Sequence, residues 1–242
     1  MMLLIARLTL TQLLGQKRIY LLAVIAALPV LIAAVFSVTG DDASPQNFAA
    51  GLAETFHITL LLPLVALILG TAAFGQEVED GTAVYILARP IPRWQIFAAK
   101  LGATWLAGGV LMVAAVVAAL GIVLAGEPQQ SLIAGFAIAS FIGMGLYSSF
   151  FIALSAFTGR ALIVGLFYIF IWEGVVTSFA PGLAHFSIRE YTLAIADAFS
   201  SSNQIQAELG LTAAAIGIGA IAILSLWFGT RQLGSFELSE RL

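Results

Sequence analysis

Long apolar runs alternate with short polar segments along most of this chain. Six of the runs are long enough to cross a hydrocarbon core about 30 Å thick, which requires roughly 20 helical residues. They cover about residues 19–38, 56–74, 98–126, 131–158, 161–180 and 209–229. The pattern predicts an all-α polytopic membrane protein with six transmembrane helices, forming a single transmembrane domain over residues 1–242.

Residues 1–18 precede the first apolar run and show a weaker pattern. Leu3, Leu10 and Leu14 share one face of a helix there, opposite Thr9 and Gln12. This spacing predicts a helix lying in the inner membrane interface, with a frayed cytoplasmic tail as the alternative. The apolar run that follows has about 20 residues, which is too long for the core of a signal peptide.

The segment 181–208 between the last two runs is the longest predicted outer loop. Its stretch Ile188–Phe199 mixes apolar residues with charged ones and is too short to cross a membrane. The mixed pattern predicts either a surface or re-entrant helix or an ordinary outer loop.

Composition agrees with a membrane protein and excludes several other classes. The chain is 61% hydrophobic and only 10% charged, and its mean hydropathy is +1.04. The absence of cysteine excludes disulfides and thiolate metal sites. A net charge of −3 gives no general affinity for nucleic acid, so none is expected as a partner.

The basic residues predict how the chain is oriented, because Lys and Arg prefer short cytoplasmic loops. With a cytoplasmic N-terminus, nine of the ten basic residues fall inside and only Arg189 falls outside. The nine are Arg7, Lys17, Arg18, Arg89, Arg93, Lys100, Arg160, Arg231 and Arg241. Both termini are therefore expected to be cytoplasmic, as is the segment 75–97.

Glu173 is the one acidic residue well inside a predicted span. A carboxylate at that depth is costly and suggests a functional group facing a cavity or a cation. The alternative is a carboxylate close enough to the outer surface to reach water, paired with Arg189. Glu173, Tyr147 and Tyr168 are the candidates for a substrate pathway.

The loop 75–97 holds an unusual density of charge for this chain. Thr82 is placed to cap a short helix over Ala83–Ala88, which should end before Pro90 because a residue that precedes proline disfavours the helical region. A connector needs only a few residues. The loop is therefore interpreted as a docking element for a cytoplasmic partner, or else as a charged loop that orients its neighbouring spans.

The common enzyme motifs are missing from the sequence. No G-x-x-x-x-G-K-[ST] nucleotide loop and no G-x-S-x-G elbow occurs. His57 and His185 lack the spacing of a zinc-binding helix, so we predict neither a catalytic nor a metal site. Two other classes stay open: a multi-spanning membrane enzyme, such as an intramembrane protease using Glu77 and Glu79, and a secondary transporter.

The loop also carries a residue pattern, E-x-x-x-G-T followed by x₄-L-x-x-P-x-x-R-x₆-K. Its residues here are Glu77, Gly81, Thr82, Leu87, Pro90, Arg93 and Lys100. In this position, between the second and third of six spans, the pattern resembles that of permeases of type 2 ABC exporters. The plan of the whole chain is also similar: an interfacial helix, six spans and both ends inside.

The resemblance implies a membrane half-transporter in a prokaryotic cell membrane. Two permease chains, identical or different, would pair, and two ATPase subunits would bind beneath them and hold the ATP and magnesium, so this chain needs no cofactor. A coupling helix in the loop would contact the ATPase and drive alternating access. The expected contact residues are Glu77, Glu79, Asp80, Gly81, Thr82, Arg89, Pro90 and Arg93.

The chain departs from this family pattern in two places. The N-terminal helix often bears acidic and basic pairs in the family, whereas Arg7 is nearly alone here. The outer loop often folds as paired re-entrant helices, and only one is expected in this sequence, at Ile188–Phe199.

Overall fold

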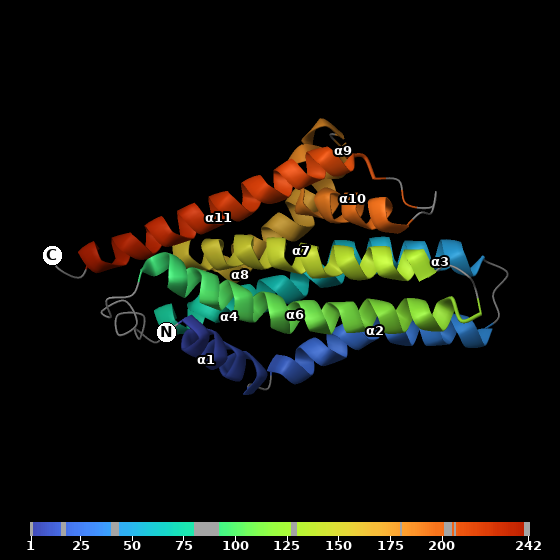
Figure 1. The fold of residues 1–242 in the computed structure, drawn as a ribbon, viewed down its shortest axis with the longest axis horizontal. Coiled ribbons are helices and arrows are strands. Elements are labelled where there is room, and N and C mark those ends of the chain that lie inside the picture. Colours follow the sequence, from blue (N-terminus) through green and yellow to red (C-terminus); the bar gives the residue numbers. More distant parts are fainter. Residues whose placement is uncertain are drawn as a thin grey trace.

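The computed structural model describes residues 2–15, 18–39, 44–79, 92–126, 130–179, 181–200, 205 and 207–239. All regular elements in these ranges are helices (Figure 1). They are α1 (Met2–Gly15), α2 (Arg18–Thr39), α3 (Pro45–Gly51), η1 (Leu52–Leu61), α4 (Leu62–Glu79), α6 (Arg93–Val123), α7 (Gln130–Phe157), α8 (Ala161–Phe167), η2 (Tyr168–Val176), α9 (Thr177–Phe179), η3 (Pro181–Phe186), α10 (Ile188–Ser200) and α11 (Leu211–Ser239). Of the segments labelled η, η1 and η2 are π-helical and η3 is a 3₁₀-helix.

Five helices in the described part of the chain are long and apolar enough to cross a membrane. They are Tyr20–Thr39, Pro45–Ala73, Arg93–Val123, Gln130–Phe157 and Leu211–Gln232. The predicted fifth span corresponds to a shorter apolar helix, Ala161–Val176. The all-helical class is therefore confirmed, but the count of six spans is not.

The second membrane-crossing helix begins at Pro45 rather than near residue 56. Ser44 caps it by accepting a hydrogen bond from the Asn47 N–H at 3.3 Å, and the Phe36 and Phe48 rings stack 3.8 Å apart. The helix then continues through η1 into α4. The predicted start near residue 56 marks where the apolar run begins. A helix can begin earlier, in polar sequence, because its backbone groups bond internally.

The helices that flank the predicted loop 75–97 extend into it. α4 continues to Glu79, and α6 begins at Arg93. α6 has 31 residues and so measures about 46 Å, which is longer than the hydrocarbon core. Its end can project into the polar layer, so the change from apolar to polar sequence did not mark the end of the helix.

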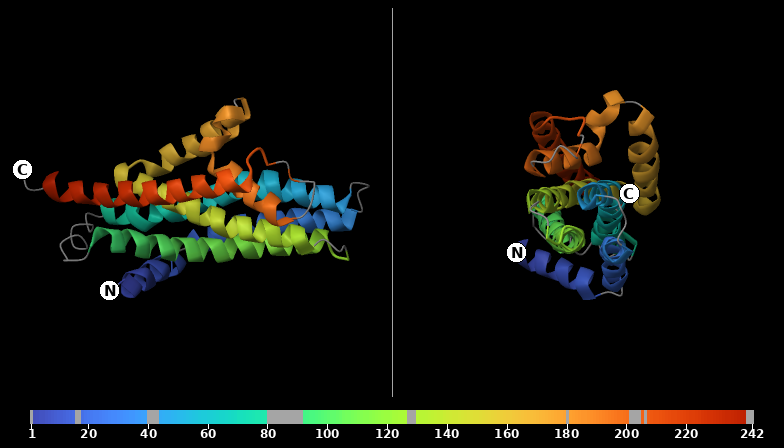
Figure 2. Two further views of the ribbon diagram at one scale, coloured as in Figure 1. Left: turned by 45° about the horizontal axis from the view of Figure 1, so that its top comes forward. Right: turned by 90° about the vertical axis from the view of Figure 1, so that its right-hand side faces the viewer.

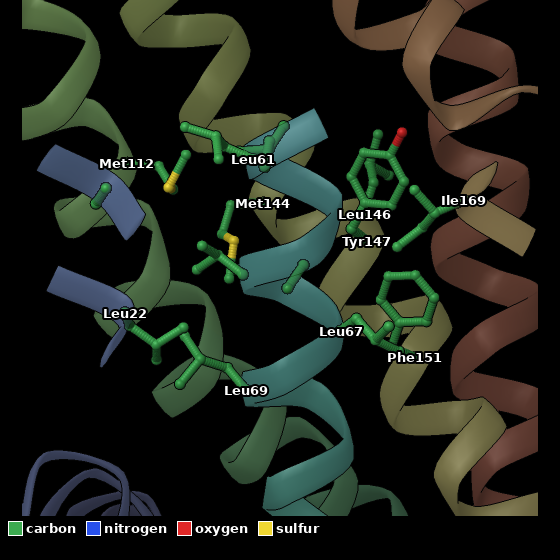
Figure 3. Close-up of a cluster of buried hydrophobic side chains, with 14 of the residues drawn as sticks. Leu22, Leu61, Leu67, Leu69, Met112, Met144, Leu146, Tyr147, Phe151 and Ile169 are labelled. Atoms are coloured by element: carbon green, nitrogen blue, oxygen red, sulfur yellow. The ribbon is translucent and has the colours of Figure 1, made fainter. Parts of the chain in front are cut away.

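α7 lies at the centre of the bundle and packs against α4, α6, α10 and α11 (Figure 2). A buried cluster joins these elements through large apolar side chains, among them Leu67, Met112, Met144 and Phe151 (Figure 3). Burial of each such side chain contributes about 1.5–3 kcal/mol in water, and in lipid the same contacts act through close packing instead. α7 is thus the framework on which the remaining helices are placed.

Candidate functional site: the start of α10

The helix predicted over Ile188–Phe199 is present as α10, and it is buried. α10 packs against both α7 and α11. Most of its side chains are out of contact with solvent, including the charged Glu190, which is 5% exposed. α10 is therefore an internal part of the bundle and not a surface loop.

Glycines on α7 allow α10 to approach closely. A Cβ added to Gly135 would lie 2.8 Å from the carbonyl oxygen of Ala196, and one added to Gly143 would lie 2.7 Å from Thr192 Cγ2. Ala139, between them, is fully buried. This row of small residues at four-residue spacing lets two backbones pack together.

A second glycine surface, on α11, receives the other side of α10. A Cβ on Gly217 would overlap the ring of Tyr191, so the ring packs directly on the α11 backbone. The Tyr191 hydroxyl donates a hydrogen bond to the carbonyl of His185, just before α10. α10 is held between two helices whose small residues leave space for it.

The N-terminus of α10 lies at the middle depth of the bundle. Thr192, in its first turns, packs on Gly143, which is at the midpoint of α7. A helix start leaves four N–H groups without partners in the helix, and there is no water in the hydrocarbon layer to satisfy them. Each of these groups needs an acceptor from the protein.

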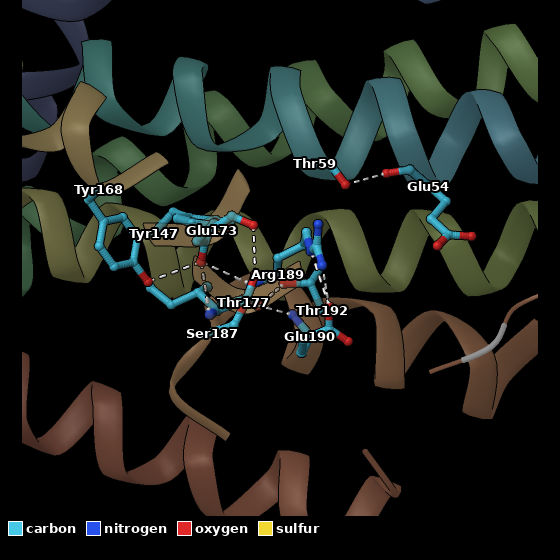
Figure 4. A network of polar contacts seen from close by, with 11 residues as sticks. Glu54, Thr59, Tyr147, Tyr168, Glu173, Thr177, Ser187, Arg189, Glu190 and Thr192 are labelled. Carbon is cyan, nitrogen blue, oxygen red and sulfur yellow. Dashed lines mark hydrogen bonds and ion pairs between the residues drawn. The ribbon is translucent and has the colours of Figure 1, made fainter. Parts of the chain in front are cut away.

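The structure provides an acceptor for all four N–H groups (Figure 4). Glu173 Oε1 accepts from the N–H of Ile188 at 3.0 Å and of Arg189 at 3.2 Å. Ser187 Oγ accepts from the N–H of Glu190 at 3.3 Å, and the N–H of Ser187 itself donates to the carbonyl of Ala184 at 3.1 Å. Glu173, which lies in η2, and Ser187 together cap the helix.

Two tyrosines complete the surroundings of the Glu173 carboxylate. The Tyr147 hydroxyl donates to Oε2, and the Tyr168 hydroxyl donates to Oε1 at 3.0 Å. Glu173 is 1% exposed and Tyr147 is 0% exposed. Four donors thus surround a buried carboxyl group that lies at the positive end of a helix dipole.

The pairing of Glu173 with the Arg189 side chain, considered above as one interpretation, is wrong. The guanidinium of Arg189 turns to Glu190, with Nη2 2.6 Å from Oε1, and only the backbone N–H of Arg189 reaches Glu173. Glu173 therefore reaches α10 through the backbone N–H groups of Ile188 and Arg189 and not through the Arg189 side chain.

The structure brings together three of the residues selected from the sequence: Tyr147, Tyr168 and Glu173. Their role in a substrate pathway stays a prediction. Because two of them are buried and their polar atoms bond to one another, their direct effect in this conformation is to fix α10. The carboxyl oxygens of Glu173 already accept four hydrogen bonds from the protein.

Most of the expected coupling-loop residues lie outside the described residues. These are Asp80, Gly81, Thr82, Arg89 and Pro90, together with the short helix expected over Ala83–Ala88. Glu77 and Glu79 belong to the last turn of α4, and Arg93 is the first residue of α6 and is half-buried.

Lys100, the last residue of the sequence pattern, is 1% exposed between α4 and α6. Its ammonium group donates a hydrogen bond to the carbonyl of Ala73 on α4. A buried cation needs such partners. Lys100 therefore ties the two helices that flank the segment 80–91.

Sequence reasoning missed two polar contacts inside the bundle. His57 Nε2 lies 3.0 Å from Ser140 Oγ, which joins η1 to α7. Ser187, the cap of α10, had a visible signal: Ser187 and Glu190 have the S-x-x-E spacing of a capping box, which marks a helix start. The Ser140 contact had none, because one serine in an apolar run has no periodicity.

The chain was also compared with known proteins. Residues 14–180, more than half of the chain, match the model of a family described as ABC-2 family transporter protein. No curated protein matches the chain.

Proposed function

The chain belongs to the ABC-2 family of transporter proteins, and from this premise we propose that it is a permease half of an exporter powered by separate ATPase subunits. The family match carries the proposal. It covers residues 14–180 and so includes the whole segment between the second and third predicted spans. Membership of the family makes the chain a multi-pass membrane permease; the source of energy and the mechanism are our inference.

A partner must supply the ATP-binding site in this proposal, because the sequence contains no nucleotide loop of its own. Magnesium and ATP would be bound by that partner. The ATPase would dock on the segment 75–97 through a coupling helix, with Glu77, Glu79, Asp80, Gly81, Thr82, Arg89, Pro90 and Arg93 as its contact residues.

The contact between α4 and α6 supports this route for force. Lys100 on α6 bonds to the carbonyl of Ala73 on α4, and both helices leave directly into the segment 80–91. A partner that pulls on this segment would move the two helices together. Such coupling requires that the ATPase contact the segment differently in its open and closed states.

The complete transporter would contain two permease chains, identical or different, and two ATPase subunits in a prokaryotic cell membrane. Six spans with both termini in the cytoplasm fit the distribution of Lys and Arg. α1 and the C-terminal end of α11 lie toward the same end of the bundle in Figure 1, which agrees with that orientation. ATP-driven rearrangement of the helices would then alternate access to the substrate.

The two other classes considered from the sequence receive no support from the site. A secondary transporter would need Glu173 to exchange a proton or cation, whereas this carboxylate accepts hydrogen bonds from two hydroxyls and two backbone N–H groups. An intramembrane protease would need catalytic groups within the spans, and its proposed acids, Glu77 and Glu79, are at the last turn of α4.

Charge reversal in the docking segment tests the proposal. The ATPase subunit is co-expressed with the permease, and the amount retained by the affinity-purified permease is measured together with ATP hydrolysis. Glu77→Lys and Arg93→Glu should each release most of the ATPase. Retention at the parental level by both variants contradicts the docking site.

Arg160→Glu is the matched control. Arg160 is exposed at the start of α8 and falls on the same predicted cytoplasmic side, so it tests whether any reversed charge on this face disturbs assembly. We expect the Arg160→Glu variant to retain the ATPase.

A further inference from the structure

The two π-helical segments of the described chain, η1 and η2, both lie beside α10. η1 contacts α10 and η2 in addition to its own neighbours in sequence. π-Helical geometry is rare and concentrates at functional sites. The π geometry of η1 and η2 therefore suggests that it serves the contact with α10.

The hydrogen bonds in these segments depend on the π geometry. Tyr168 donates to Glu173 at 3.0 Å, although the two are five residues apart. In an α-helix, residues five apart point about 140° away from each other, so this bond could not form. Thr59 in η1 likewise donates to the carbonyl of Glu54, five residues back, at 2.8 Å.

Other threonines of the chain show the ordinary geometry. Thr71 and Thr192 donate to carbonyls four residues back, those of Leu67 and Ile188, as hydroxyls in α-helices do. Both five-residue bonds found among the described residues lie in η1 and η2, and the Tyr168–Glu173 bond is linked to the π form of η2.

Return of η2 to α-helical geometry would shift its register by one residue. Such a shift rotates the residues beyond it by about 100° relative to α8. Glu173 would then leave both Tyr168 and the N–H groups of Ile188 and Arg189. The contact with α10 is thus available only while η2 is π-helical.

We propose that η2 is a two-state element, in which the π form holds α10 at mid-depth through Glu173 and the α form releases it. This inference rests on the proposed function, because movement of the membrane helices by an ATPase supplies the force that changes the register. Glu173 acts here as a positioning residue. The contacts of α10 with α7 and α11 that remain after release are made on glycine-lined surfaces, at Gly143 and Gly217.

The natural chain has no cysteine, so one introduced thiol can report on α10. Ala194 is 2% exposed on this helix, and Ala194→Cys adds a small side chain there. The complex with its ATPase is placed in lipid nanodiscs, and the rate at which a water-soluble maleimide labels the thiol at position 194 is measured with and without ATP and magnesium.

We expect slow labelling without nucleotide and faster labelling during hydrolysis. The increase should be roughly tenfold or more, equivalent to about 1.4 kcal/mol in the free energy of exposing the site. Equal rates in the two conditions, in a complex that hydrolyses ATP, overturn the proposal while leaving the proposed function intact.

Deletion of Ile171 in the Ala194→Cys background tests the π geometry directly. Ile171 is 47% exposed and lies between Tyr168 and Glu173, so its removal places these two residues four apart, the spacing at which an α-helix brings side chains together. The contact between Glu173 and α10 should persist without a π segment, and the introduced thiol should label slowly in both conditions. Ile171→Ala, which keeps the residue count, is the control and should behave like the parent.

Tyr168→Phe provides a test that needs no ATPase. It removes the bond that requires the π form, and labelling of the introduced thiol in the permease alone should become faster. An unchanged rate in this variant overturns the inference whether or not an ATPase binds. The inference is also overturned if ATP accelerates labelling of the thiol as much in the Ile171 deletion as in Ile171→Ala.

Discussion

α1 and α10 are two short helices of nearly equal length, 14 and 13 residues, in very different surroundings. α1 buries one side, with Thr9 and Leu13 inside, and leaves Leu8 and Gln12 exposed. α10 is buried on nearly all sides. Two helices of nearly the same length therefore differ in burial: α1 lies at the edge of the bundle and α10 lies inside it.

The difference lies in what the surroundings must provide. Water can satisfy the polar groups on the exposed side of α1, whereas the first N–H groups of α10 depend on Glu173 and Ser187. A helix that starts inside a membrane bundle therefore needs an acceptor on a neighbouring segment. An acidic residue in an apolar span is explained here by a helix end rather than by a cation.

The largest expected effect comes from removing that acceptor. Glu173→Leu leaves two N–H groups and two hydroxyls inside the bundle without their partner, and should cost on the order of 3–5 kcal/mol. The midpoint of thermal unfolding in detergent measures the loss. Glu208→Leu, at an exposed position before α11, should leave the midpoint unchanged.

Closing the space between α7 and α10 should have the next largest effect. Gly135→Ala places a Cβ 2.8 Å from the Ala196 carbonyl oxygen and 2.9 Å from the Ser200 nitrogen, so a backbone must shift. Such overpacking costs about 1–3 kcal/mol. In Gly121→Ala on α6 the new Cβ meets nothing within 4 Å, and we expect no loss of stability. Equal midpoints of thermal unfolding for the two variants would contradict the close packing of α10 on α7.

The sequence predicted much of this arrangement, because apolar length and rare polar residues are strong signals. The apolar runs became helices, and Tyr147, Tyr168 and Glu173 proved to be neighbours. Gly135 and Gly143 on α7 and Gly217 on α11 receive α10, but small residues in an apolar helix do not reveal which helix packs on them.

Three features could not be read from the sequence. The depth of α10 depends on tertiary packing, and the partners of Glu173 include backbone N–H groups, which no residue type reveals. The π segments do not show because both faces of these spans are apolar. The second membrane-crossing helix begins at Pro45, before the apolar run that starts at residue 56, so apolar length did not mark its start.

Replacing the serine caps of α10 and α3 compares a buried helix start with an exposed one, and a smaller loss of stability is expected. Ser187 is fully buried at the start of α10, and Ser44 is exposed at the start of α3. Replacement by alanine should cost about 1–2 kcal/mol at position 187 and about 0.5 kcal/mol at position 44, because water replaces only the exposed cap. Thermal unfolding of both variants measures the difference. A larger loss of stability at position 44 than at position 187 would mean that burial does not determine the cost of removing a cap.

The smallest effect is expected on the exposed side of α1. Arg7→Ala and Gln12→Ala change side chains that contact solvent, and each should shift stability by less than about 0.5 kcal/mol. The same unfolding assay applies. A loss of stability comparable to that of Ser187→Ala would show that these side chains of α1 contribute as much to the fold as the cap of α10.

Hydrogen–deuterium exchange of the amides of Ile188–Tyr191, measured in lipid nanodiscs, tests the central claim most directly. We predict exchange as slow as at the midpoint of α7 in the parent protein, and accelerated about 100-fold in Glu173→Leu, which corresponds to roughly 3 kcal/mol. Exchange in the parent protein as fast as that of the exposed residues of α1 would contradict an α10 whose start is held at mid-depth by Glu173.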